Sequence, residues 1–519
     1  MKINKKVEVI IVAVLYLVCL YFWTLPIQNI DSPYGEVDAA SHYGIADYTI
    51  EQDKSISYIP YFLDRRYGND NRFEPHTLWY PPPFHMVLAI GAYFGGDTTQ
   101  GIFIANTIMC SIFVLSIYFV IRKLFGFEIA LVSSFFLIFS LRDIMIFLWG
   151  QWPERLGFAY VPLVLYCFYK YCDSYLKKEE KPVYIYLTAI LLAINLFIHP
   201  MVVFHSIGGI MVLFVLLLIK ERKLFFSFKH AIFAILLFVV VLGMFPSQVM
   251  NVVIRTQNEP DLFGGKGDYS RLFSWFKPQE DNYGVPQSYF SFKEMVAPYW
   301  AIIFLLIGII FLFLRRKRKD LLMLAWLISL YVMTHIDVIG KGRVHRSLSG
   351  TAHIFYPLMV IGLVYLVSFV APRVKEYKGW VKVLGLALFA VFLGMAIIPS
   401  SYKQLDEAYP AITRLNEDQI QASEWMKENI NPGSTLFHQG SISLAKTRWF
   451  RTVSQRYLVN DDFENRIGNI THMIIDYSDF ARIGEQNALN GLRAWEIQNY
   501  GNKTPVYNSE LIRVYEFEN

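Results

Sequence analysis

Residues with acid–base chemistry follow the first apolar run of the chain. Glu36, Asp38 and His42 lie close together between Asp31 and Tyr43. If a helix begins near Asp38, its carboxylate lies at the helix N-terminus, where the dipole favours the ionised form, and His42 lies one turn later on the same face. Such a pair suits a general base or a metal ligand. The plain alternative is a helix cap beside a surface histidine.

A second group of polar residues lies at the ends of later apolar runs. Asp143 and Glu154 are acidic candidates, and His199 stands directly before a proline. Each has an ordinary alternative. Glu154 could form an ion pair with Arg155 or Arg142, and a histidine before a proline is a common start of a helix.

A third candidate is the short basic segment from Lys341 to Arg346, which also contains Arg343 and His345. Arg343 and Arg346 are three residues apart and can share one helical face. Guanidinium groups bind phosphate oxygens bidentately, so this segment suits a phosphate group. Contact with ordinary anionic lipid headgroups is the alternative.

The composition indicates that membrane helices position these residues. Of 519 residues, 54% are hydrophobic, 17% are aromatic and only 18% are charged, with a mean hydropathy of +0.34. Soluble domains are nearer a quarter charged. The net charge of +5 is small and its cations are dispersed in short patches, which argues against a nucleic-acid partner. The protein is predicted to be polytopic in a membrane.

About eleven apolar runs approach the length of some 20 residues that a spanning helix needs. We interpret the first as a retained helix, because no small-residue cleavage site follows it. The runs lie near residues 8–25, 101–121, 127–141, 155–172, 183–198, 201–219, 230–246, 298–314, 320–335, 351–371 and 380–398.

The basic residues between these runs predict the orientation. With the N-terminus in the cytoplasm, five basic loops fall on the cytoplasmic side, as the positive-inside rule requires. This agreement holds if residues 83–96 form a helix at the membrane interface instead of spanning it. The extracytoplasmic side of the plasma membrane then holds a first loop over 26–100, a loop over 248–297, the basic segment and the C-terminal residues.

The residues from 400 to 519 have a soluble composition. Residues 416–430 are typical of an amphipathic helix that ends at Asn431-Pro-Gly433. Short apolar runs at 435–438, 472–476 and 511–517 predict strands. We therefore predict a membrane-embedded domain over 1–399 and a small extracytoplasmic α/β domain over 400–519.

Three motifs together resemble the GT-C superfamily of integral-membrane glycosyltransferases. They are the acidic motif after the first helix, the run Trp79-Tyr-Pro-Pro-Pro-Phe-His-Met-Val-Leu-Ala89, and a helix ending in Arg122-Lys-Leu-Phe-Gly126. That superfamily includes protein O-mannosyltransferases, aminoarabinose transferases and oligosaccharyltransferase catalytic subunits. Gly150-Gln-Trp-Pro-Glu154 and His199-Pro200 resemble uncharacterised microbial members. The motifs cover residues 1 to about 220, and the rest is similar in architecture.

The resemblance implies a role for each candidate. Asp38 would be the catalytic carboxylate, with Glu36 as its acidic neighbour and His42 beside it. Glu154, or else Asp143, would be the second acidic position. Apart from the resemblance, the chemistry of the basic segment suggests that Arg343, His345 and Arg346 bind the donor phosphate. Further cavity candidates are His199, Tyr80 and His85. Glu36 and Asp38 form Glu-x-Asp, whereas some members of the family have Asp-x-Asp and others Asp-Glu. This departure leaves open whether Asp38 and Glu154 hold a divalent cation such as Mg²⁺ or Mn²⁺.

The resulting hypothesis is a glycosyltransferase that transfers a hexosyl or pentosyl group from a polyprenyl-phosphate donor to a protein, lipid or glycan acceptor. Two alternatives are a transporter or flippase and a polymerase or ligase of lipid-linked glycans. A transporter would place ionisable groups within its membrane helices, whereas the charged residues of this sequence lie mostly between the apolar runs.

Overall fold

The computed structural model describes residues 3–28, 32–63, 66–67, 73–74, 78, 82–246, 249, 279–280, 286–287, 292–335, 347–370, 378–408, 413–440, 443–459 and 470–517. The chain forms two compact units. The first comprises Met1–Trp23, Thr107–Ile146 and Trp152–Gln404, and the second comprises Thr24–Asn106, Phe147–Gln151 and Leu405–Asn519. The C-terminal residues thus share a compact unit with the whole of the predicted first loop, residues 26–100. The functional division near residue 400 stays a prediction.

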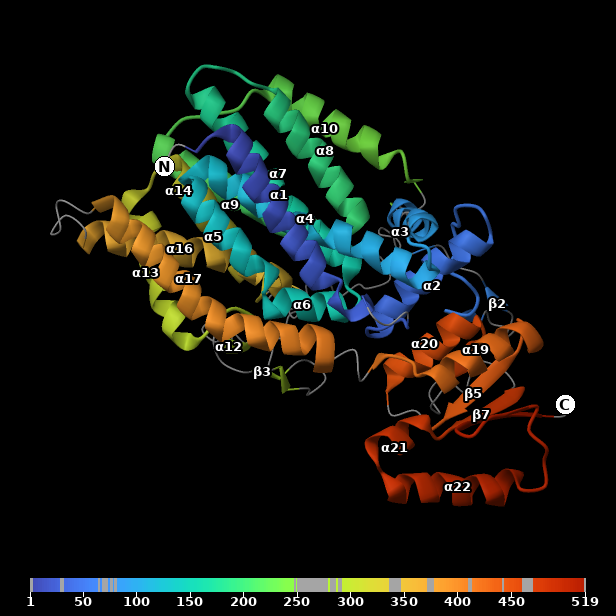
Figure 1. Ribbon diagram of the computed structural model, residues 1–519. Helices are drawn as coiled ribbons and strands as arrows, with labels where there is room; N and C mark the ends of the chain where they lie inside the picture. Colours follow the sequence, from blue (N-terminus) through green and yellow to red (C-terminus); the bar gives the residue numbers. More distant parts are fainter. Residues whose placement is uncertain are drawn as a thin grey trace. The chain divides into compact units, whose positions relative to one another are not determined.

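The first unit is mainly helical (Figure 1). Two short strands, β3 (Gln279–Glu280) and β4 (Pro286–Gln287), pair antiparallel. The helices wholly or mostly in this unit are α1 (Lys5–Trp23), α4 (Thr98–Phe125), α5 (Phe127–Ile138), α6 (Leu141–Leu148), α7 (Trp152–Leu176), α8 (Val183–Ile198), α9 (Pro200–Glu221), α10 (Phe228–Leu242), α12 (Phe292–Met295), α13 (Ile302–Arg315), α14 (Arg318–Met333), α16 (Thr351–Val370) and α17 (Lys378–Tyr402).

A helix occupies each predicted apolar run. In the described part of the chain, five helices are long and apolar enough to cross a membrane, and the bent pair of α5 and α6 would make a sixth. Helices α8, α10 and α13 are apolar but shorter. The protein is therefore a multi-pass membrane protein, as predicted, while the number of about eleven spans stays a prediction.

Glycines allow α13 and α16 to pack closely. A side chain on Gly308 would overlap the backbone carbonyl of Leu358, and one on Gly362 would overlap that of Phe304. Phe311 and Tyr365 stack nearby with ring centroids 3.9 Å apart. Small residues are typical of helix interfaces in membranes, where close van der Waals packing replaces the hydrophobic driving force.

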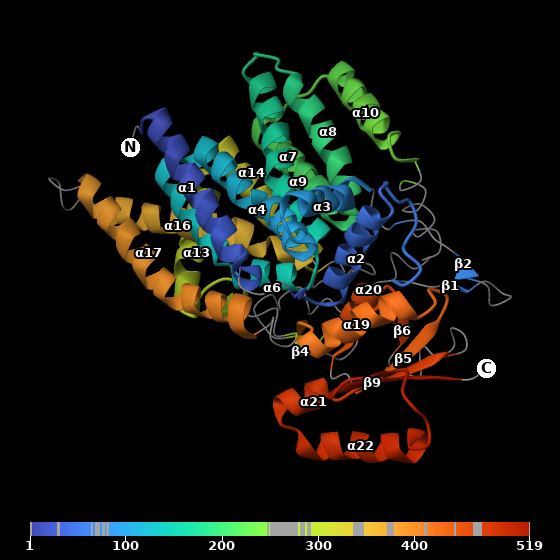
Figure 2. The same cartoon turned by 45° about the vertical axis from the view of Figure 1, so that its right-hand side comes forward.

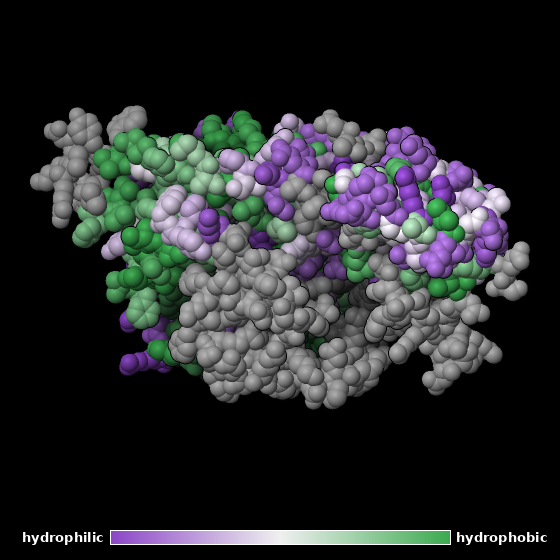
Figure 3. Space-filling model, turned by 90° about the horizontal axis from the view of Figure 1, so that it is seen from below, coloured by the Kyte–Doolittle hydropathy of each residue, from purple (hydrophilic) through white to green (hydrophobic). Residues whose placement is uncertain are grey.

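The outer surfaces of the helices are apolar. Exposed Val240 on α10, Phe313 on α13 and Met395 on α17 are examples. In Figure 3, apolar side chains gather over helices of the first unit, whereas hydrophilic ones dominate the visible C-terminal residues. The first unit thus has the surface of a membrane-embedded bundle.

The N-terminal part of the second unit carries the predicted acidic motif. Its elements are η1 (Leu25–Ile27), α2 (Val37–Glu51), the paired strands β1 (Arg66–Tyr67) and β2 (Phe73–Glu74), and α3 (Pro82–Phe94). Helix α3 occupies the segment predicted to lie at the membrane interface. Ile45, Phe62 and Leu78 belong to a small buried cluster that joins α2 to the loop after it.

The C-terminal part is the predicted α/β domain. Its five strands run in the order β6-β5-β7-β9-β8; β5 is parallel to β6 and β7, and β9 is antiparallel to β7 and β8. The elements are η8 (Lys403–Ala408), α19 (Glu417–Asn429), β5 (Thr435–Gln439), α20 (Leu444–Ser454), β6 (Tyr457–Val459), β7 (His472–Asp476), α21 (Ser478–Ile483), α22 (Gln486–Tyr500), β8 (Tyr507–Asn508) and β9 (Ile512–Glu516).

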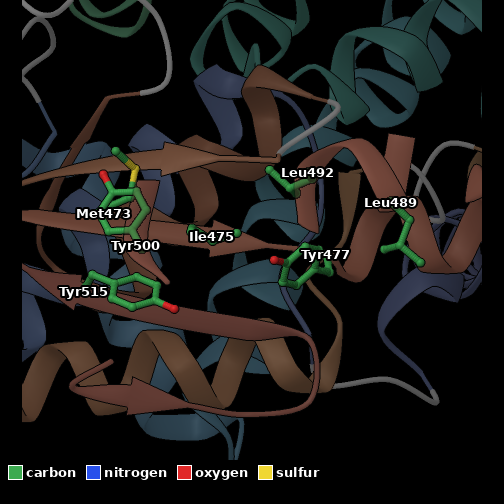
Figure 4. Close-up of a cluster of buried hydrophobic side chains, with 7 residues drawn as sticks. All are labelled: Met473, Ile475, Tyr477, Leu489, Leu492, Tyr500 and Tyr515. Carbon is green, nitrogen blue, oxygen red and sulfur yellow. The ribbon is translucent and has the colours of Figure 1, made fainter. Parts of the chain in front are cut away.

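Helices cover both faces of this sheet. Figure 2 shows α19 and α20 on one face and α22 on the other. Beneath α22, a core cluster contains Ile475, Leu492 and Tyr515, all of which are buried (Figure 4). At the other face, Asn416 caps α19 by accepting a hydrogen bond from the Gln419 backbone N–H over 2.9 Å. The prediction of α19, β5, β7 and β9 is confirmed, and α20, α21 and α22 are additional.

Candidate functional site

The acidic motif is the start of helix α2. Gly35 turns the chain with φ +113°, and Glu36 is the N-cap residue. The Glu36 backbone N–H donates a 2.9 Å hydrogen bond to the carbonyl oxygen of Leu148. Asp38 lies in the first helical turn and is partly exposed. The helix therefore begins as predicted, but the cap is Glu36, so the alternative reading of Asp38 as the cap is wrong.

Gly150 packs directly against this helix start. It adopts φ +81°, and a side chain there would lie 2.6 Å from the carbonyl carbon of Asp38 and still closer to the backbone of Ala39. Only glycine combines that φ with so little space. The Gly-Gln-Trp-Pro-Glu motif thus supports the backbone that carries Asp38.

His42 and His85 form a buried pair. His42 Nδ1 and His85 Nε2 are 2.9 Å apart, and the ring of Phe84 packs against both imidazoles. Because one nitrogen donates and the other accepts, the contact couples the tautomers of the two rings. Burial lowers the pKa of His85 to about 3, which keeps its imidazole neutral. His42 is therefore a buried histidine held by His85, and the surface-histidine alternative is wrong.

Glu154 and His199 meet in the first unit. The Glu154 carboxylate accepts a 2.6 Å hydrogen bond from the Ser349 hydroxyl, and its other oxygen lies 3.8 Å from His199 Nε2. All three side chains are almost completely buried. His199 is the N-cap residue of α9 but makes no side-chain capping bond. The sequence motifs at the starts of α7 and α9 thus bring two predicted site residues together.

A second group of buried polar side chains is centred on Arg155, which follows Glu154 in α7. Arg155 forms an ion pair with Asp143, and its guanidinium lies 2.9 Å from His353 Nε2 and 3.6 Å from the ring centre of Phe113. Asp143 also lies 3.2 Å from His353 Nε2. The partners of Arg155 are therefore Asp143 and His353, not Glu154. Asp143 is committed to this internal pair, which makes Glu154 the better second acidic candidate.

Ser349 and His353 were not predicted as members of these groups, and Arg155 was considered only as a possible ion-pair partner of Glu154. The signal was present for two of them, because Arg155 and His353 are ionisable residues at the ends of apolar runs, where burial requires a partner. The charged residues of the sequence are thus not confined to the segments between helices.

Other predicted residues lie outside the described part of the chain. These are Tyr80, Arg343, His345 and Arg346. Among the described residues, no group of three or more His, Cys, Asp or Glu side chains is arranged to hold a metal ion. Asp38 belongs to the second unit and Glu154 to the first.

The helical bundle, the acidic helix start after α1 and the C-terminal α/β domain define a membrane protein of the GT-C fold. The archaeal oligosaccharyltransferase AglB from Archaeoglobus fulgidus, solved with an inhibitory peptide and a dolichol-phosphate, is similar with a TM-score of 0.57 and 12% identity, over 93% of this chain and 70% of that one. ArnT from Cupriavidus metallidurans, solved with undecaprenyl phosphate, is similar with a TM-score of 0.54 and 11% identity, over 97% of both chains. The predicted GT-C resemblance is confirmed for the fold.

The chain belongs to the family of unknown function DUF6541, whose model matches residues 5–439. The match includes the whole membrane bundle, the acidic motif and strand β5. A search of curated proteins found no match.

Proposed function

We propose that the protein is a glycosyltransferase that takes its sugar from a polyprenyl-phosphate-type donor on the extracytoplasmic face. The observation that carries the proposal is Asp38, a partly exposed carboxylate in the first turn of α2, within a GT-C fold. The lipid phosphates in the AglB and ArnT structures support a donor of that chemical class.

In the proposed reaction, an acceptor hydroxyl or amide attacks the anomeric carbon of the donor sugar. The bond from that carbon to the phosphate oxygen breaks, and the phosphate leaves with the electron pair. Asp38 accepts the proton of the acceptor or orients the acceptor. Glu36 adds negative charge beside Asp38, and the buried His42 orients the Asp38 carboxylate. Arg343 and Arg346, with His345, neutralise the phosphate charge that develops.

Glu154 completes the proposed acidic pair. Its Ser349 hydrogen bond fixes one carboxylate oxygen and leaves the other directed to His199. If a Mg²⁺ or Mn²⁺ ion takes part, we propose Asp38 as one of its ligands, and the ion would supply charge stabilisation for the phosphate. Transfer measured with and without a chelator tests this part of the proposal.

The test is Asp38→Asn in purified protein reconstituted in vesicles with undecaprenyl- and dolichyl-phosphate hexoses and pentoses. An amide cannot accept the proton, so the transfer rate should fall by about a hundredfold to ten-thousandfold. The loss of helix-dipole stabilisation should cost only about 0.3–1 kcal/mol of unfolding free energy. Asp53→Asn is the matched control, because Asp53 is exposed just after the other end of the same helix. Near-normal transfer by Asp38→Asn would reject the proposal.

One observation favours the transporter alternative. Asp143, Arg155 and His353 are ionisable groups buried among helices of the bundle, and such groups often mark transport pathways. Their contacts with one another also fit a purely internal ion pair. Movement of a fluorescent lipid-linked glycan across vesicles tests this alternative. Movement that persists in Asp38→Asn and is lost in Asp143→Asn would support a transporter.

The orientation is part of the proposal. A cysteine in place of Ser509 should react with a membrane-impermeant thiol reagent in intact cells, and one in place of Lys317 should not. The opposite pattern would place the second unit in the cytoplasm and remove the extracytoplasmic reaction.

A further inference from the structure

The loop before α2 is held by two residues that lie 378 and 414 positions later in the chain. The Gly35 backbone N–H donates a 3.0 Å hydrogen bond to the Thr413 hydroxyl, and the Gly35 carbonyl accepts a 2.7 Å hydrogen bond from the Trp449 indole. The backbone N–H and the carbonyl of Gly35 are therefore both hydrogen-bonded to the C-terminal part of the second unit. Thr413 and Trp449 are almost completely buried.

Further contacts with C-terminal residues fix the chain on both sides of Gly35. The Ser32 hydroxyl donates to the carbonyl of Leu415 over 2.9 Å, and the Thr452 hydroxyl donates to the carbonyl of Ala40 over 3.2 Å. The Trp449 ring also packs edge-on against Tyr43, with centroids 5.5 Å apart. The first turn of α2, which contains Asp38, thus lies between two points that the C-terminal residues fix.

The backbone at Gly35 cannot relax easily by itself. Gly35 has φ +113°, and a side chain there would lie 2.9 Å from the Leu148 carbonyl oxygen and 2.7 Å from the Ala39 side chain. The conformation is one that L-residues rarely adopt, so it depends on the surrounding contacts. A buried N–H or carbonyl left without its partner would favour a different loop conformation.

We infer that the C-terminal α/β domain is a positioning element for the acidic helix start, with Thr413 and Trp449 as positioning residues for Asp38. This inference rests on the proposed function of Asp38. It assigns to Thr413 and Trp449 a role in turnover instead of donor or acceptor binding. A shift of about 1 Å in a catalytic group can lower a rate by about a hundredfold, so partial loosening should have a measurable effect.

The principal variant is Thr413→Val, which keeps the side-chain shape and removes the acceptor of the Gly35 N–H. We expect the turnover rate at saturating donor to fall about tenfold, with the donor KM unchanged within about twofold. Thr413→Ser keeps the hydroxyl and should restore turnover. Trp449→Phe removes the indole donor and should act in the same direction, which provides a second test if Thr413→Val folds poorly.

Thr447→Val is the matched control. Thr447 is buried in the same domain, and its hydroxyl lies 3.1 Å from His438 Nδ1 instead of contacting the loop. It should lose comparable thermal stability while turnover stays normal. An equal loss of turnover in Thr447→Val and Thr413→Val would overturn the inference, because the effect would then be a general loss of stability.

Hydrogen exchange provides a readout that needs no enzymatic activity. In the full-length protein, the amides of residues 32–40 should exchange about fivefold faster in Thr413→Val than in the wild type or Thr447→Val, as expected for the loss of one hydrogen bond. Unchanged exchange would overturn the inference even if turnover fell. If the wild type transfers no sugar from any donor, the proposed function fails, whereas faster exchange would still show that Thr413 holds the helix start.

Discussion

In the variant Gly150→Ala, a local steric clash should add to the cost of ordinary backbone strain in the free energy of unfolding. An alanine at φ +81° costs about 1–2 kcal/mol because the residue is in the left-handed region. Its Cβ would also lie 2.6 Å from the carbonyl carbon of Asp38, below the 3.0 Å that real Cβ contacts respect. Overpacking of this kind adds about 1–3 kcal/mol. The total loss in unfolding free energy should therefore be about 2–5 kcal/mol.

Gly96→Ala is the matched control for this experiment. Gly96 has a similar φ of +75°, but a Cβ there would meet no atom within 4 Å. It should lose only the 1–2 kcal/mol or so of backbone strain. Intrinsic fluorescence during thermal unfolding in detergent would compare the two variants. Sugar transfer should fall about a hundredfold in Gly150→Ala, because the start of α2 must move, and stay near normal in Gly96→Ala. Equal stability and equal transfer in both variants would refute the packing argument.

The remaining predictions concern the donor phosphate and the effect of pH. Replacing Arg343 and Arg346 together with glutamine should weaken donor binding by about 1.5–3 kcal/mol for each lost contact, measured as donor affinity, whereas the same change at the exposed Arg222 and Lys223 should not. Because burial lowers the pKa of His85 from 6.5 to about 3, the unfolded chain binds a proton between these pH values that the folded chain does not. Stability should therefore be complete above about pH 6.5 and decrease as the pH falls, by up to about 1.4 kcal/mol per pH unit, and His85→Gln should flatten this decrease in thermal unfolding.

Helices and their ends were the most predictable part of the fold. Apolar runs and basic patches are local signals, so the sequence indicates α4, α7 and α16 without knowledge of their partners. The start of α2 near Asp38 and the helix opened by Asn416 were also predictable, because each follows from residues within one turn.

The contacts that organise the candidate site could not be predicted in the same way. His42 and His85 are 43 positions apart, Glu154 and Ser349 are 195 apart, and Gly35 and Trp449 are 414 apart. No local pattern specifies which distant residue satisfies a buried polar group. The motif that ends at Glu154 was noticed for its carboxylate, yet its first glycine is explained only by the backbone of Asp38 and Ala39.

The discontinuous second unit has a consequence for biosynthesis. Gly35 is translated 414 residues before Trp449, which at roughly 5–20 residues per second is a delay of about 20–80 s. During that time the newly made helices can enter the membrane, while the loop before α2 lacks the hydrogen bonds that hold its backbone. The loop before α2 can therefore gain both hydrogen bonds of Gly35 only after Trp449 has been translated. A nascent or truncated chain that ends before Thr413 would contain every membrane helix and would still lack both of these hydrogen bonds at Gly35.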